Sequence, residues 1–253
     1  IGELIGDELS TIGFNLFFGP SLDVLDITYS EGNENLGVRT FGGDPYWVGE
    51  MGAAYISGLH SGSQNRIAVI SKNFPGRGSS DRLPEEEVAT VRKSLEQLQL
   101  IELAPFFKVT DLQSQDSTQL TDGLLSSHIR YQGFQGNIRA TTKPISFDQN
   151  AVDLLMGLAP INAWRENGGV LVSDDLGSQA VYQFFDPNAN YIDARQVVRN
   201  SFLAGNDLLF MDKLISTGDE NRFVTYRKTI DLFVQKYNED QAFAEKVDES
   251  VVR

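Results

Sequence analysis

The sequence predicts an α/β fold, a TIM-type (β/α) barrel in which parallel strands are covered by helices. Strand-like apolar segments alternate with helical patterns, and the connections between them are long. Two of the strands, at residues 67–72 and 168–173, run directly into polar residues. Catalytic groups in such barrels lie at the carboxyl ends of the strands, so these two strands predict a shared pocket there.

Five segments have the apolar character of buried strands. They are residues 14–18, 67–72, 124–129, 170–173 and 207–211. Helical patterns occupy residues 45–60, 85–99, 148–165, 190–204 and 222–236, and Ser146 and Asp193 are expected N-caps. Residues 25–38, 75–84 and 112–122 are expected loops. Five strands are fewer than the eight of a closed barrel, so we expect one incomplete barrel domain over residues 1–253.

The composition excludes several classes of protein. With 35 acidic and 21 basic residues the formal charge is −14, which argues against a nucleic-acid partner because phosphate contacts need clustered Lys and Arg. No apolar run approaches the roughly 18 residues of a membrane span. The chain has no cysteine, and its two histidines, His60 and His128, are far apart, so we expect neither a transition metal nor another cofactor.

Both ends of the chain interrupt a helical pattern. The sequence starts at Ile1 without an initiator Met and stops abruptly at Arg253. We therefore expect that the barrel is clipped at both ends, with room for a further domain after Arg253. The compartment cannot be predicted, because neither a leader nor cysteine usage can be judged.

Polar residues follow the two strands that predict the pocket. Residues 72–78 read Lys-Asn-Phe-Pro-Gly-Arg-Gly, and Asp174 and Asp175 end the later strand. Taken alone, a Lys at a strand end is usually solvated, Phe-Pro-Gly can be a simple tight turn, and such an Asp most often caps a helix. Because side chains alternate along a strand, Asp175 is expected to point away from the pocket that Asp174 faces.

These blocks resemble glycoside hydrolase family 3, and its bacterial β-N-acetylhexosaminidases in particular. Residues 72–78 are similar to the family's Lys-His-Phe-Pro-Gly-His-Gly, with Asn73 and Arg77 in place of its histidines. Residues 173–174 resemble the family's nucleophile motif, although Ser178 stands where the family usually has Met. The resemblance covers nearly the whole chain. It implies that the first helix precedes the third barrel strand, so the first two strands would lie upstream.

The resemblance implies a retaining glycosidase mechanism. Asp174 would attack the anomeric carbon and hold a covalent glycosyl intermediate. Lys72, Asn73 and Arg77 would donate hydrogen bonds to the hydroxyls of the sugar, which Asn and Arg can do as well as His. The block therefore predicts a sugar pocket that survives the loss of the two histidines.

A second pair of blocks also resembles the family. Residues 19–24 (Gly-Pro-Ser-Leu-Asp-Val) and 39–45 (Arg-Thr-Phe-Gly-Gly-Asp-Pro) carry Asp23 and Arg39. Taken alone, these two would most often form a structural ion pair. The resemblance implies that Arg39 and Asp23 contact the sugar or order the site, with loop ordering the better reading for Asp23. Asp44 with Pro45 is expected to start a helix.

The family's acid/base motif, Asp-Ser-His, is missing. Counting on from the last Gly of the 72–78 block places Glu85 where the family has this His. Glu85 could protonate the leaving oxygen if substrate binding favours its protonated form. The plainer reading, which we prefer at this point, is that residues 84–87 are the exposed acidic first turn of a helix.

The remaining candidates are single residues. His128 ends the strand at residues 124–129, where the family often has a His, so it is expected to bind sugar or to support the site. His60 falls in a helical pattern and is expected at the surface. Trp47 and Trp164 also fall in helical patterns and are expected in the core.

Taken together, the sequence predicts a retaining exo-acting β-glycosidase that hydrolyses terminal β-linked sugars, with β-N-acetylglucosamine as one candidate. The expected partner is thus a carbohydrate substrate. The alternative is a catalytically impaired, carbohydrate-binding relative that lacks the acid/base. A third possibility is that the acid/base belongs to a part of the protein outside this chain.

Overall fold

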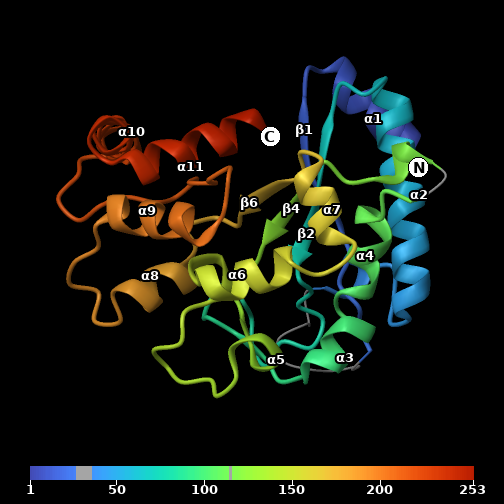
Figure 1. Ribbon diagram of the computed structural model, residues 1–253, viewed down its shortest axis with the longest axis horizontal. Coiled ribbons are helices and arrows are strands. Elements are labelled where there is room, and N and C mark those ends of the chain that lie inside the picture. The colour runs from blue at the N-terminus through green and yellow to red at the C-terminus, as the bar shows by residue number, and fades with distance from the viewer. Residues whose placement is uncertain (27–35, 114–115) are drawn as a thin grey trace.

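A four-stranded parallel sheet in the order β1-β2-β4-β6 forms the centre of the fold (Figure 1). The computed structural model describes residues 1–26, 36–113 and 116–253. The four strands are β1 (Leu16–Ser21), β2 (Ala68–Phe74), β4 (Gly123–Ser126) and β6 (Val170–Ser173). The predicted strand at 207–211 is reduced to a parallel bridge between Val172 and Leu208. The arrangement is that of an open TIM-type barrel.

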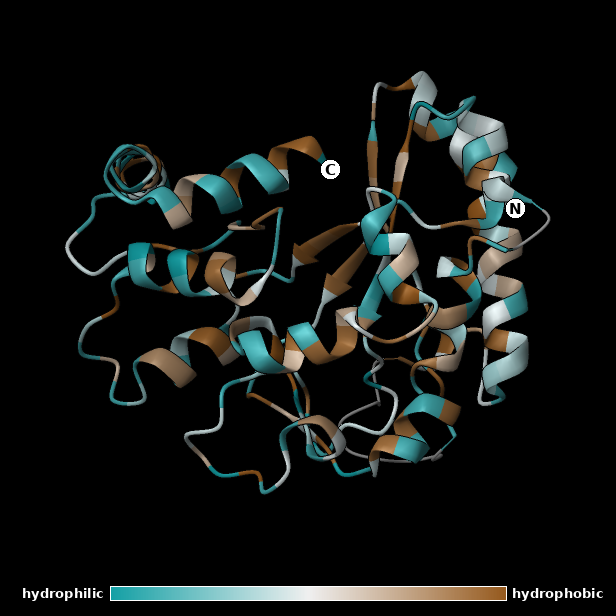
Figure 2. Cartoon of the chain, in the orientation of Figure 1, coloured by the Kyte–Doolittle hydropathy of each residue, from teal (hydrophilic) through white to brown (hydrophobic). Residues whose placement is uncertain are grey.

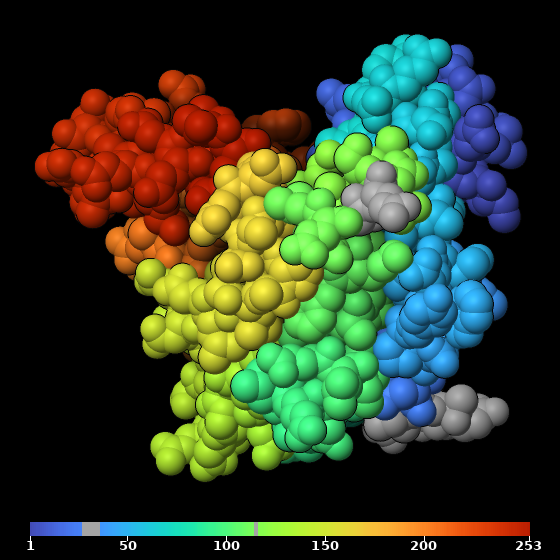
Figure 3. Space-filling model, turned by 45° about the vertical axis from the view of Figure 1, so that its right-hand side comes forward, coloured from blue at the N-terminus to red at the C-terminus, as the bar shows by residue number. Residues whose placement is uncertain are grey.

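Helices cover both flanks of this sheet. Figure 1 shows α1 (Gly2–Thr11), α2 (Pro45–Ser63) and α4 (Ala104–Thr110) on one side, and α9 (Ala194–Ala204), α10 (Arg222–Glu239) and α11 (Gln241–Val252) on the other. Figure 3 likewise places the first and last parts of the chain on opposite flanks. The shorter helices are α3 (Leu95–Leu100), α5 (Gln132–Gln135), α6 (Gln149–Met156), α7 (Ile161–Glu166) and α8 (Gln179–Phe185). In the described ranges, none is long and apolar enough to cross a membrane.

The apolar strands form the core. Val69, Leu124 and Leu171 are fully buried and pack in one cluster with Ile56 and Leu59 from α2. Figure 2 shows the same contrast, with hydrophobic strands inside and helices whose polar residues lie outward. Burial of these side chains, at about 25 cal/mol per Å² of apolar surface, is the main force that holds the sheet against α2.

Small residues let α1 lie directly on α2. The buried positions of α1 are Gly2, Gly6 and Ser10. A Cβ atom added to Gly62 of α2 would lie 1.9 Å from the carbonyl oxygen of Glu3, so a larger residue cannot be accommodated there. The two helices therefore touch through their backbones.

Helix ends confirm some capping predictions and correct others. Asp44 caps α2, with Pro45 in the first turn, and Asp193 caps α9, both as predicted. Ser146 is not a cap. It is buried, and Asp148 caps α6 instead, two residues later.

The prediction of a helix over residues 85–99 is largely wrong. Residues 84–86 form a turn, and Thr90–Val91 form β3, which pairs with β5 (Arg130–Tyr131). Only α3 is helical, and it begins after Ser94, which forms a capping box with Gln97. That capping box gives the segment a helix start well beyond Pro84.

The predictions for the two tryptophans have different outcomes. Trp164 is buried, and its indole N–H donates to the carbonyl of Thr121 at 2.8 Å, as expected of a core residue. Trp47 lies on α2 but is 60% exposed, so its assignment to the core is wrong. The loops predicted at 25–38 and 112–122 fall partly outside the described residues. Residues 75–84 form a loop, as predicted, with an isolated antiparallel bridge from Ser80 to Val91.

Candidate active site

Two neighbouring hollows open at the carboxyl edge of the sheet. The β1-side hollow, of about 580 Å³, is lined by Lys72, Asn73 and Arg39. The β6-side hollow, of about 640 Å³, is lined by His128 and other residues after β4 and β6. Arg77, Glu85 and Asp174 line both hollows and therefore form the boundary between them. The pocket predicted from the strand ends thus consists of two adjoining hollows.

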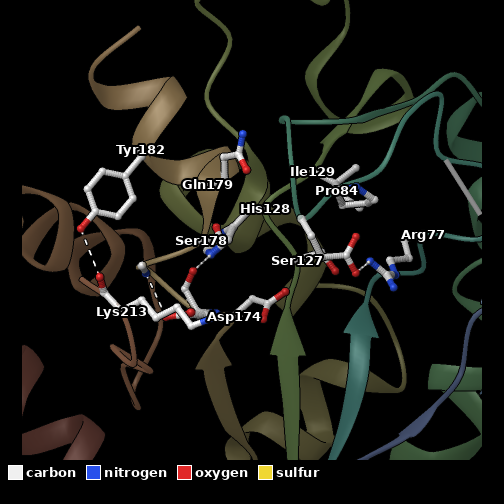
Figure 4. A pocket seen from close by; sticks show the side chains of 13 residues that line it. Arg77, Pro84, Ser127, His128, Ile129, Asp174, Ser178, Gln179, Tyr182 and Lys213 are labelled. Carbon is white, nitrogen blue, oxygen red and sulfur yellow. Dashed lines mark hydrogen bonds and ion pairs between the residues drawn. The ribbon is translucent and has the colours of Figure 1, made fainter. Parts of the chain in front are cut away.

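Asp174 directly follows the end of β6, and Figure 4 shows it above the strand ends. Its backbone N–H donates to the carbonyl of Ser126 at 3.1 Å, which extends the pairing of β4 with β6 to this residue. Its Oδ1 accepts the Asp175 N–H at 2.8 Å. The sheet thereby holds a half-buried carboxylate at a fixed place on the boundary of the two hollows.

Asp175 also lines the β6-side hollow, so the expectation that it turns away from the pocket is wrong. Its Oδ1 accepts the N–H groups of Gly177 at 2.9 Å and Asp212 at 3.1 Å. Burial raises the pKa of the Asp175 carboxyl above its ordinary value, while these two hydrogen bonds act in the opposite direction. The side chain serves to join the loop after β6 to the loop near residue 212.

Asp23 is fully buried and lies behind the site. Its Oδ1 accepts the Arg77 N–H at 2.8 Å, and its Oδ2 accepts from Asn73 Nδ2 and Ser21 Oγ, both at 2.5 Å. The carboxylate therefore joins the end of β1 to the 72–78 loop. Asp23 lines neither hollow, and these hydrogen bonds fit the role of ordering the loop. It forms no ion pair with Arg39, whose exposed side chain lines the β1-side hollow.

Arg77 and Glu85 form an ion pair across the boundary, with 2.7 Å between Nη1 and Oε1 (Figure 4). The Arg77 side chain is buried, whereas 53% of the Glu85 side chain is exposed. Burial alone would lower the pKa of Arg77, but the negative charges of Asp23, Glu85 and Asp174 raise it further above its ordinary value. Arg77 is therefore a permanent cation between two carboxylates.

The surroundings of Glu85 overturn the plainer reading of this residue. It lies in a turn and not in the first turn of a helix. Its carbonyl accepts the N–H of Ala180 at 3.3 Å, which joins this turn to α8 beside Asp174. The turn thus places the Glu85 carboxylate at the boundary of the hollows, where the acid/base hypothesis needs it.

A buried charge cluster supports the 72–78 loop from beneath. The carboxylate of Glu102 is inaccessible and accepts from Lys93 Nζ at 2.8 Å and from Ser79 Oγ at 2.6 Å. Lys93 also pairs with Asp26, and Tyr131 donates to the carbonyl of Gly76 at 2.8 Å. Burial raises the pKa of Glu102, against the opposing effect of Lys93.

The sequence analysis missed this cluster. The sign that could have found it is a lone Glu in the apolar run 98–106 (Leu-Gln-Leu-Ile-Glu-Leu-Ala-Pro-Phe), because an acid buried in such a run needs a partner.

His128 lines the β6-side hollow, but protein groups occupy both ring nitrogens. Nδ1 lies 2.7 Å from Ser146 Oγ, and Nε2 lies 3.0 Å from the carbonyl of Asp175. Burial lowers the pKa of His128, so the ring is neutral, with Nε2–H donating to Asp175 and Nδ1 accepting from Ser146. Of the two expected roles, this geometry favours support of the Asp174–Asp175 turn over a hydrogen bond to sugar.

The β1-side hollow combines cations with aromatic rings. Lys72 lies on β2 close to its carboxyl end and forms no ion pair with any residue in the described ranges. Phe18, Phe41 and Tyr55 provide apolar surface beside it. In the same ranges, no group of three or more His, Asp or Glu side chains could hold a metal ion.

The geometry can now be set beside known proteins. The model of the glycosyl hydrolase family 3 N-terminal domain matches residues 1–253. The chain belongs to glycosyl hydrolase family 3. This finding confirms the resemblance that the 72–78 block and the Asp174 motif predicted.

Curated relatives within the family carry the name β-hexosaminidase. One from Hydrogenovibrio crunogenus is 24% identical over 219 residues, which is 85% of this chain and 54% of the relative. One from Pseudomonas aeruginosa is 27% identical over 176 residues, 69% of this chain and 45% of the relative. This chain therefore spans about half the length of the curated relatives that it matches.

Solved structures from the family confirm the TIM-type fold. A family 3 β-N-acetylglucosaminidase from Paenibacillus superposes with a TM-score of 0.77 at 24% identity, over 100% of this chain and 41% of the other. A β-N-acetylhexosaminidase from Beutenbergia cavernae gives a TM-score of 0.72 at 20% identity, over 100% and 65% of the two chains.

Proposed function

We propose that this family 3 chain provides the catalytic barrel of a retaining exo-acting β-glycosidase. One observation carries the proposal: Asp174 and Glu85 both line both hollows, so a glycosidic bond lying across the boundary is within reach of two carboxyl groups. Two carboxyl groups that flank the bond are what most glycosidases use. The curated relatives are named β-hexosaminidases and the similar structure from Paenibacillus is a β-N-acetylglucosaminidase, so β-N-acetylglucosamine is the first sugar to test.

Asp174 is the nucleophile in this proposal. Its carboxylate forms a bond to the anomeric carbon while the bond from that carbon to the leaving oxygen breaks. Water then attacks the same carbon and releases Asp174, so two inversions give net retention of configuration. The hydrogen bond from the Asp175 N–H to Asp174 Oδ1 holds one oxygen, which leaves Oδ2 as the attacking atom.

Glu85 is the proposed acid/base. It gives a proton to the leaving oxygen in the first step and takes one from water in the second. Its half-exposed side chain is a carboxylate in the ion pair with Arg77, so the leaving group has to replace Arg77 as its neighbour and Glu85 has to take up a proton from solvent before it can act as the acid. Arg77 then remains to balance the charge of Asp174.

The β1-side hollow is the proposed site of the sugar that is cleaved off. Lys72, Arg39 and Asn73 bring hydrogen-bond donors to its walls, and Phe18 and Tyr55 bring apolar surface. Sugars present both hydroxyl groups and apolar C–H faces, so such a mixed wall suits them.

The experiment uses the full-length parent protein and a panel of nitrophenyl β-glycosides. Release that disappears in Asp174→Asn supports the proposal and identifies the sugar. The matched control is Asp153→Asn, an exposed acid on α6 that lines neither hollow. Sugar binding without release from any glycoside would instead indicate the impaired carbohydrate-binding relative.

A second experiment tests Glu85 by itself. Glu85→Gln is expected to lower turnover of an alkyl glycoside, a poor leaving group, about 10²- to 10⁴-fold, because protonation is then essential. Turnover of a dinitrophenyl glycoside should change little in the first step, since its leaving group needs no proton. Full activity of Glu85→Gln on the alkyl glycoside would remove Glu85 from the mechanism.

A further inference from the structure

The two hollows share only their boundary. Arg77, Glu85 and Asp174 belong to both, while Lys72, Arg39 and the rings of Phe18, Phe41 and Tyr55 belong to the β1-side hollow alone. If Asp174 and Glu85 act on one glycosidic bond, the groups on the two sides of that bond occupy different hollows. With the cleaved sugar in the β1-side hollow, the β6-side hollow is left for the leaving group.

We propose that the β6-side hollow is a leaving-group subsite, and that Gln179 and Lys213 select a second sugar as the leaving group. This inference rests on the proposed function and adds the substrate's second half to it. A hollow of about 640 Å³ lies within the range of small-molecule sites.

The outer wall of this hollow is rigid and carries two free polar side chains. Tyr182 is fixed because its Oη donates to the Lys213 carbonyl at 3.2 Å and accepts the Ile215 N–H at 2.8 Å. Figure 4 shows Lys213 and Tyr182 on the side of the hollow that faces Arg77 and Ser127. Gln179 and the Lys213 ammonium are exposed and make no side-chain hydrogen bond or ion pair within the described ranges.

The inner wall of the hollow is polar and carries a positive charge. Arg77 and Ser127 line it, and the Arg77 guanidinium is held there by its ion pair with Glu85. A hydroxyl group of a bound sugar can accept a hydrogen bond from such a cation.

This polarity indicates the class of leaving group. Gln179 and Lys213 offer donors on the outer wall and the Arg77 guanidinium offers donors on the inner wall, while the ring of Tyr182 adds aromatic surface to the outer wall. A sugar has hydroxyl groups that can meet donors on both walls, whereas a simple alkyl alcohol would leave most of them unpaired. The subsite therefore favours a saccharide.

The test compares two substrates of the same cleaved sugar in the full-length protein. One is the β-linked disaccharide, and the other is the glycosyl fluoride, whose leaving group is too small to fill the hollow. Gln179→Ala and Lys213→Ala should each lower kcat/KM for the disaccharide about 2- to 10-fold and leave kcat/KM for the fluoride within about twofold. Lys143→Ala, an exposed lysine outside both linings, is the matched control.

Equal losses on both substrates, or no loss on either, would overturn the inference. A second measurement needs no turnover. In an Asp174→Asn background, adding Gln179→Ala and Lys213→Ala should weaken disaccharide binding in calorimetry and leave binding of the single sugar unchanged. Failure of the glycosidase proposal would appear separately, as wild-type protein that hydrolyses neither substrate. Unchanged disaccharide binding would count against the subsite in either case.

Discussion

Replacing Asp23 should loosen the floor of the site without removing any group that lines it. Its carboxylate accepts three hydrogen bonds from buried partners, the Arg77 N–H and the side chains of Asn73 and Ser21. In Asp23→Ala the Ser21 hydroxyl can rotate to another acceptor, but the Arg77 N–H and the Asn73 amide lose theirs. Each buried donor left unsatisfied costs about 1–3 kcal/mol, so we expect the free energy of unfolding to fall by about 2–6 kcal/mol.

Asp23→Asn should cost less. Its amide oxygen can keep the Arg77 N–H, and its new NH₂ can be accommodated if the Asn73 amide turns over and the Ser21 hydroxyl reverses. What is then lost is the negative charge facing the 72–78 loop. We expect about 1–2 kcal/mol, so Ala should be the more damaging of the two replacements.

Urea unfolding at equilibrium measures both changes, from the midpoint and the slope of each transition. Asp153→Ala is the matched control, because this exposed acid on α6 should change stability by no more than about 0.5 kcal/mol. A loss below about 1 kcal/mol in Asp23→Ala would refute the reasoning, as would Asn being worse than Ala.

Three further predictions concern residues around the site and at the opposite edge of the sheet. Lys93→Met leaves the inaccessible Glu102 carboxylate without its counter-ion, so thermal or urea unfolding should show that the free energy of unfolding falls by about 3–5 kcal/mol. The double variant Lys93→Met/Glu102→Leu should lose less, because no carboxylate is then left buried without a partner. Equal losses in the two variants would contradict the pairing. His60 donates towards both the Thr118 carbonyl and Asp122. Burial opposes its charge, yet these acceptors raise the pKa of His60. The stability that His60 contributes should thus be fully present below about pH 6.5 and be lost as pH rises through the folded pKa. The measurement is the free energy of unfolding of the wild type minus that of His60→Gln at each pH, and a difference that grows with pH would contradict this prediction. Gly78→Ala would place a Cβ atom 1.8 Å from the Val24 carbonyl oxygen, so circular dichroism melting should show clear destabilisation, and an unchanged melting temperature would contradict this packing.

The sequence predicted the features that depend on local patterns. Strand positions follow from apolar runs, and the strand ends place Lys72 and Asp174 at one edge of the sheet. Asp44 and Asp193 were found as caps because capping depends on a few neighbouring residues.

The failures concern features that depend on distant residues. His60 was expected at the surface, but it is buried because Thr118 and Asp122 approach it from another segment. The Arg77–Glu85 pair depends on the turn at residues 84–86. This turn was not predicted because the acidic run there has the pattern of the first turn of a helix. The fifth strand is short because only Leu208 bridges to β6.

The central claim is that Asp174 becomes covalently bound to sugar. The most direct measurement is mass spectrometry of the full-length protein, quenched during turnover of a slowly deglycosylating activated glycoside and then digested. The account predicts a glycosyl group on the peptide that contains Asp174, absent from Asp174→Asn, with the β-anomer as the first product seen by NMR. An adduct on another carboxylate, or an α-anomer as the first product, would contradict it.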